Sequence, residues 1–122
     1  MKTEESILDE YGKVMIQSVF DNQYNFIKND IKDLAETEGY KNLFGNMTPL
    51  QKREIENYTN ELLRGCLFEF LKIFEENDEF KLIYEEDGQQ VNLVEISEML
   101  KAEPIIDNGW IERFSREVGK GE

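Results

Sequence analysis

The stretch TPLQKREIENYTNELLRGCLFEFLKIFEEN, residues 48–77, decides how this chain folds. Thr48 supplies a hydroxyl that can cap a helix, Pro49 suits the first helical position, and Gln51 can close a capping box. Beyond this cap, apolar side chains recur at steps of three and four residues, the spacing that places them on one face of a helix. The sequence therefore predicts a long central helix over about residues 49–77.

The apolar stripe of this helix is wide, and it contains a glycine and the single cysteine of the chain. Gly65 is the one strong helix breaker between Leu62 and Phe74, and it indicates a mild bend or the close approach of another helix. Cys66 shares the stripe with Leu62 and Phe70, so we expect a buried, unreactive thiol and not a nucleophile. A single cysteine cannot form an internal disulfide, and the first residues do not resemble a secretory signal. Both observations predict a soluble protein of the reducing cytoplasm.

The first third of the chain also has a helical pattern. Its apolar residues fall on compatible faces, but Gly12 interrupts them, so the segment can form one long helix or two short ones. Gly39 is a candidate cap at the end of this region. Residues 41–47 then read as a connection to the central helix.

After residue 77 the period of the apolar residues changes from 3.6 to 2, which is typical of β-strands. Two such runs flank Asp87-Gly88, a dipeptide that favours the type I′ turn of a hairpin. Asn92 can cap a short helix that ends before Pro104. A final short helix is expected from about Gly109 to Glu117.

Length and composition fit one domain. A chain of 122 residues lies near the commonest domain size, and its 39% hydrophobic content is too high for a disordered acidic tail. We therefore expect a single α+β domain over residues 1–118, mostly helical, with a long central helix, one β-hairpin and two short C-terminal helices. Residues 119–122 are expected to fray as a C-terminal tail.

The charged residues exclude many classes of function. The chain carries 27 acidic and 14 basic side chains, a net charge of −13, and no histidine. Without histidine, imidazole-based triads and Cys/His zinc sites cannot form within the chain. Its glycines match no phosphate-binding loop, and an EF-hand alignment on Gly88 puts Ile83 and Val94 at ligand positions, so that motif fails. We predict no catalytic, metal-binding or cofactor-binding residues, no direct contact with nucleic acid and no membrane insertion.

The remaining positive signal is a group of carboxylates at the end of the central helix and in the hairpin. Negative charge at a helix C-terminus opposes the macrodipole and costs roughly a few tenths of a kcal/mol per residue, which suggests a role other than stability. Solubility alone is the competing explanation. Tryptophan is enriched at binding hot spots, although packing in the core explains Trp110 better. The candidate protein-binding residues are Glu75, Glu76, Asp78, Glu79, Glu85, Glu86, Asp87 and Trp110.

These features favour a small acidic cytoplasmic binding protein that engages a basic protein partner. In size, charge and lack of catalytic residues it resembles bacterial immunity proteins, which implies neutralisation of a basic toxin such as a nuclease. Three alternatives stay open: a structural subunit of a larger assembly, a mimic of nucleic acid, and a carboxylate-based or metal-assisted enzyme. The subunit would need a large exposed apolar patch, the mimic a long stripe of carboxylates, and the enzyme a concave pocket with converging acids.

Overall fold

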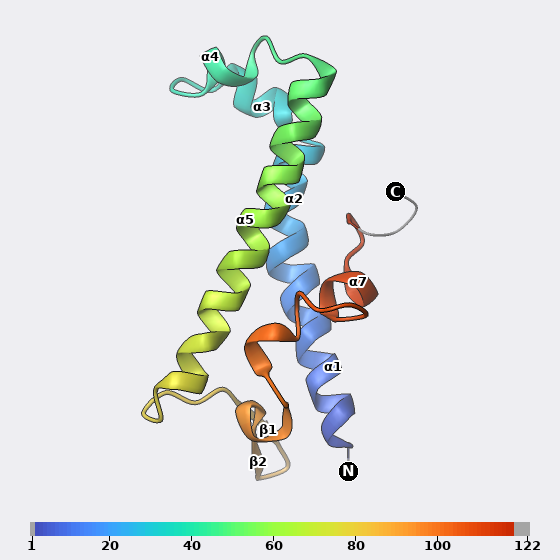
Figure 1. The fold of residues 1–122 in the computed structure, drawn as a ribbon, viewed down its shortest axis with the longest axis vertical. Coiled ribbons are helices and arrows are strands. Elements are labelled where there is room, and N and C mark those ends of the chain that lie inside the picture. Colours follow the sequence, from blue (N-terminus) through green and yellow to red (C-terminus); the bar gives the residue numbers. More distant parts are fainter. Residues whose placement is uncertain (1, 119–122) are drawn as a thin grey trace.

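The computed structural model describes residues 2–118, and helices dominate it (Figure 1). The α+β architecture expected from the sequence is confirmed: a long helix, one two-stranded antiparallel hairpin and short C-terminal helices make up a single small domain. In chain order the elements are α1 (Glu4–Met15), η1 (Ile16–Phe20), α2 (Asp21–Lys28), α3 (Ile31–Glu36), α4 (Lys41–Phe44), α5 (Pro49–Glu76), β1 (Ile83–Glu86), β2 (Gln89–Asn92), α6 (Leu93–Ile96), η2 (Leu100–Ala102) and α7 (Trp110–Phe114).

The N-terminal helical segment is continuous from Glu4 to Lys28, because α1, η1 and α2 follow one another without a break, and we call it the N-terminal rod. The helical pattern of the first third thus forms one long helix, and its last residues form a separate short helix, α3, after a break at residues 29–30. η1 is a π-helical turn, in which the N–H of Asp21 donates to the carbonyl of Ile16 five residues earlier. Gly12 does not interrupt the rod; a Cβ at this position would lie 2.5 Å from the Trp110 ring.

The long helix predicted over residues 49–77 is observed as α5, Pro49–Glu76. Its capping box is also confirmed: the Gln51 N–H donates to the Thr48 hydroxyl at 3.1 Å, and the Thr48 N–H donates to the Gln51 side chain at 2.9 Å. Figure 1 shows α5 beside α2 and diverging from α1 toward its C-terminal end, where the C-terminal segment of the chain lies between them.

The core lies where the N-terminal rod, the C-terminal half of α5 and the C-terminal segment meet. At its centre Trp110 is fully buried, and its ring meets Tyr11 edge to face at a centroid distance of 5.9 Å. From α5 only Leu67 and Leu71 are buried. The buried apolar residues are Ile7, Leu8, Met15, Ile16, Phe20, Tyr24, Leu67, Leu71, Leu93, Leu100, Trp110, Ile111 and Val118.

The predicted hairpin is present, with β1 antiparallel to β2 and Tyr84 opposite Val91. Asp87 and Gly88 have φ values of 52° and 83°, the positive angles that a type I′ turn requires at both central positions. Tyr84 and Val91 pack against the core, as does Leu82 just before β1. The apolar side of the hairpin is thus covered by the helices, which an isolated hairpin would need for stability.

The C-terminal third departs from the sequence-based prediction in two places. The helix expected to run from Asn92 almost to Pro104 stops at Ile96, because Ser97 has an extended backbone and its hydroxyl donates to Glu103 at 2.7 Å. A separate 3₁₀ turn, η2, follows.

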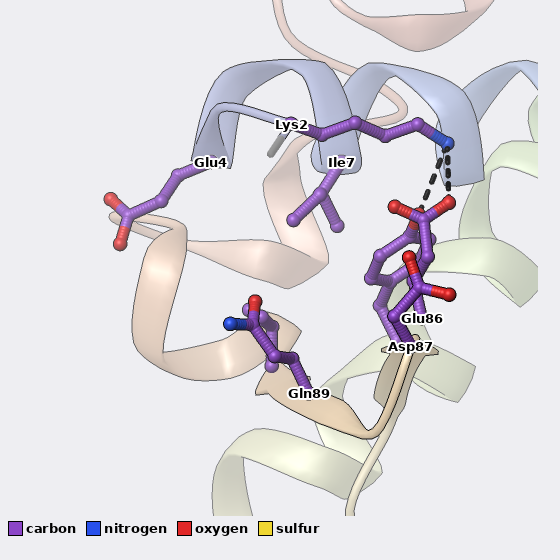
Figure 2. Close-up of a pocket in the computed structure, with 8 residues that line it drawn as sticks. Lys2, Glu4, Ile7, Glu86, Asp87 and Gln89 are labelled. Carbon is purple, nitrogen blue, oxygen red and sulfur yellow. Dashed lines mark hydrogen bonds and ion pairs between the residues drawn. The ribbon is translucent and has the colours of Figure 1, made fainter.

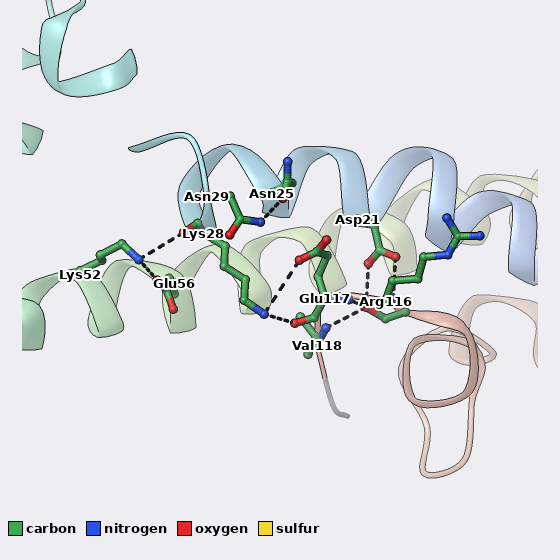
Figure 3. A network of polar contacts seen from close by, with 10 residues as sticks. Asp21, Asn25, Lys28, Asn29, Lys52, Glu56, Arg116, Glu117 and Val118 are labelled. Atoms are coloured by element: carbon green, nitrogen blue, oxygen red, sulfur yellow. Dashed lines mark hydrogen bonds and ion pairs between the residues drawn. The ribbon is translucent and has the colours of Figure 1, made fainter. Parts of the chain in front are cut away.

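The last helix, α7, ends at Phe114, and the prediction that it continues to Glu117 is wrong. Ser115 has an extended backbone, and its hydroxyl and the N–H of Arg116 both donate to the carboxylate of Asp21 on α2 (Figure 3). These contacts replace the hydrogen bonds that would continue the helix. The expected frayed tail, residues 119–122, lies outside the described residues.

Candidate protein-binding surface

The seven carboxylates singled out in the sequence lie on two neighbouring parts of the chain. Figure 1 shows the C-terminal end of α5 and the hairpin β1–β2 at the same, lower end of the molecule. Six of the seven residues are exposed, and Glu75 is half-buried. We call this group the acidic end; it consists of Glu75, Glu76, Asp78, Glu79, Glu85, Glu86 and Asp87.

Three members of the acidic end already have partners within the chain. Glu75 accepts a 3.2 Å hydrogen bond from the Lys101 N–H, and Glu85 accepts one of 2.9 Å from the Gln90 side chain. Glu86 lies 3.5 Å from the Lys2 ammonium.

The side chains of the other four carboxylates of the acidic end have neither a hydrogen-bond nor an ion-pair partner among residues 2–118. Exposed carboxylates without such partners keep a surplus of negative charge on this part of the described surface. These residues are Glu76, Asp78, Glu79 and Asp87.

A cavity of about 350 Å³ lies between the N-terminal residues and the hairpin (Figure 2). Lys2 reaches across it: its Nζ lies 2.8 Å from the Glu10 carboxylate and donates to the Tyr84 hydroxyl at 3.0 Å. These two hydrogen bonds, that to Glu10 first, raise the pKa of Lys2 above its usual range. Figure 2 also shows that Glu4 points away from Lys2. The cavity thus holds a neutralised cation that fastens the N-terminus to the hairpin.

Trp110 does not lie on the surface. It is fully buried beside Tyr11, whose pKa is raised by burial. Packing in the core, the explanation favoured by the sequence, is confirmed, and the indole cannot contact a partner in this structure.

Cys66 is exposed, so the prediction of a buried thiol is wrong. The side of α5 that faces the core bears Leu67 and Leu71, and Cys66 lies about 100° around the helix from Leu67, where the side chain is exposed. The close approach predicted at Gly65 is not made by the described part of the chain either, because a Cβ there would meet nothing within 4 Å.

An exposed apolar surface on α5 is the main feature that sequence reasoning missed. Tyr58, Leu62, Phe70 and Ile73 are 59, 51, 45 and 42% exposed, and they follow one another at helical spacing with Cys66 between them. We call these five residues the apolar row. The width of the apolar stripe could have predicted this surface. A helix whose apolar residues extend beyond the face packed on the core leaves some of them exposed unless a second element covers them.

No group of three or more side chains among residues 2–118 has the types and positions needed to hold a metal ion. Within the same range, no helix is both long enough and apolar enough to cross a membrane.

Comparison with known proteins gives no relative: no protein-family model, no curated protein and no solved structure matches this chain.

Proposed function

We propose that this chain is a small acidic binding protein that engages a basic protein partner through its acidic end. The supporting observation is the set of four carboxylates there without a described hydrogen-bond or ion-pair partner: Glu76, Asp78, Glu79 and Asp87. Surplus charge of one sign on one part of a protein accelerates association with a partner of opposite charge and orients the encounter.

The concrete form of the proposal is a cytoplasmic inhibitor of the immunity type. A nuclease-like toxin binds its substrate through cationic groups that recognise phosphates, and carboxylates projecting from a helix end and a hairpin turn complement such groups. The inhibitor would act by covering the substrate site, which requires no catalytic residue of its own.

The test is a pull-down from native lysate at low salt with two variants of equal net charge. The first reverses unpaired acids of the acidic end, Glu76→Lys, Asp78→Lys and Glu79→Lys. The control reverses three exposed acids elsewhere, Asp33→Lys, Glu36→Lys and Asp107→Lys. We expect the wild type and the control to retain a basic protein that the first variant loses and that salt elutes. Equal retention by both variants would contradict the proposal.

A structural subunit of a larger assembly is the second candidate, and the apolar row is the observation that favours it. A subunit held by apolar burial stays bound when the ionic strength rises, because the hydrophobic effect is not screened by salt. Co-purification of a partner in fixed stoichiometry at high salt would support this candidate over the inhibitor.

A further inference from the structure

We infer that the apolar row of α5 is the docking site for an amphipathic helix with basic flanking residues, presented by the partner protein. The inference rests on the proposed function, because it names the element of the basic partner that would lie next to the acidic end. It extends that function to a second surface, which begins at Tyr58 and ends at Ile73, just before the acidic end.

The spacing and exposure of the row fit a helical partner. Its five side chains follow the pattern of i, i+4, i+8, i+12 and i+15, so they form one stripe along about four turns of α5. Each of the four large side chains is at least 42% exposed. A partner helix buries such a stripe with its own residues at positions i, i+3, i+4 and i+7.

The middle of the row is shaped for close approach. Gly65 lies on the same exposed side, and the open space around its missing Cβ leaves room for a partner side chain. An open hollow of about 690 Å³ lies beside it, and its lining combines apolar side chains with charged ones: Leu62, Phe68 and Ile105 with Glu61, Arg64 and Glu69. An apolar side chain of the partner can enter this hollow beside Leu62.

Acidic residues flank the row at a regular interval. Glu54, Glu61, Glu69 and Glu76 are all exposed and are separated by seven or eight residues, which places them along one side of the row. Only Glu69 has a described cation nearby, with Lys72 at 3.7 Å. Basic residues at a seven-residue spacing on the partner helix would lie next to these carboxylates.

The same acids disfavour an antiparallel second copy of this chain as the occupant. Glu54 and Glu76 are each 11 residues from Gly65, and Glu61 and Glu69 are each 4 residues from it. An antiparallel pair of α5 helices centred on Gly65 would therefore set Glu54 against Glu76 and Glu61 against Glu69. This antiparallel arrangement brings like charges together, whereas a basic helix brings opposite charges together.

Alkylation of Cys66 can measure binding at the row, because Cys66 is the single cysteine of the chain and lies in the middle of the row. The rate at which a maleimide alkylates it reports whether the row is covered. The probe is a synthetic amphipathic peptide of Leu and Lys, about 18 residues long so that it spans the row. The control peptide has the same composition in an order without helical periodicity. We expect the amphipathic peptide to slow alkylation by about tenfold or more at saturation, and the control peptide to leave it unchanged.

Two variants, each replacing an exposed aliphatic residue by glutamine, locate the contact. Leu62→Gln lies on the row at 51% exposure, and Val14→Gln lies on α1 at 57% exposure. Leu62→Gln should weaken binding of the amphipathic peptide by about tenfold, the effect of losing one buried leucine, and Val14→Gln should leave it unchanged.

The outcomes separate this inference from the proposed function. If the pull-down recovers a salt-released basic protein while the peptide neither protects Cys66 nor depends on Leu62, the docking site is wrong and the proposed function stands. If the peptide binds at the row and no basic protein depends on the acidic end, the proposed function fails instead. A dimer of the free protein that protects Cys66 and dissociates in Leu62→Gln would overturn the inference in favour of a second copy.

Discussion

Ser115 donates a 2.6 Å hydrogen bond from its hydroxyl to Asp21, and both residues are buried although 94 positions separate them in the sequence. The other oxygen of the carboxylate accepts from the Arg116 N–H at 2.8 Å. The Ser115 hydroxyl also accepts from the N–H groups of Glu117 and Val118. Asp21 therefore fixes the last described turn of the chain to the N-terminal rod (Figure 3).

Replacing Asp21 by alanine should lower the free energy of unfolding by about 2 to 4 kcal/mol, because it leaves a buried hydroxyl and a partly buried N–H without an acceptor. Urea denaturation measures this change. Asp33→Ala, at an exposed position of α3, is the control and should change stability by less than about 0.5 kcal/mol. Equal losses in the two variants would show that Asp21 does not fasten the C-terminal segment.

Two glycine substitutions should have opposite effects on stability. Gly12→Ala places a methyl group 2.5 Å from the Trp110 ring, so we expect the steric cost to exceed the gain in helix propensity and to destabilise the protein by about 1 to 2 kcal/mol. Gly65→Ala meets no neighbour and should stabilise α5 by about 0.5 to 1 kcal/mol. Thermal and urea unfolding check both values. A stabilising Gly12→Ala would mean that Trp110 does not pack against α1 as described.

The exposure of Cys66 predicts a readily alkylated thiol. Its rate in the folded protein should lie within about tenfold of the rate in concentrated urea, because solvent reaches the sulfur in both states. Mass spectrometry during the reaction gives both rates. Strong protection of Cys66 in the isolated folded protein would contradict the exposed position and support the buried thiol predicted from the sequence.

The sequence predicts local structure correctly where residues close together in the chain determine it. The Thr48 capping box and the Asp87-Gly88 turn are set by residues within a few positions of one another, and both are observed. The burial of Trp110 followed from its apolar neighbours in the sequence.

The sequence-based predictions fail where residues far apart in the chain determine burial or the end of a helix. Cys66 was assigned to the core because a helix with a wide apolar stripe gives no sign of which side the rest of the chain will cover. α7 ends at Phe114 because Asp21, far away in the sequence, captures the next hydrogen-bond donors. The acidic end could be predicted as a group of residues, but which of its carboxylates are paired depends on Lys2, Gln90 and Lys101.

The π-helical turn Ile16–Phe20 acts as a rotational offset within the rod. A π-helical turn accommodates one residue more than the α-helical ladder would, and one residue corresponds to about 100° around a helix axis. Because the π-helical turn takes up that extra residue, deleting one residue here would restore a regular α-helix and leave Asp21 facing Ser115 and Gly12 facing Trp110. A deletion elsewhere between Gly12 and Asp21, with the π-helical turn kept, would instead rotate one of these contacts away by about 100°. The π-helical turn therefore lets Gly12 and Asp21 both face the C-terminal segment of the chain.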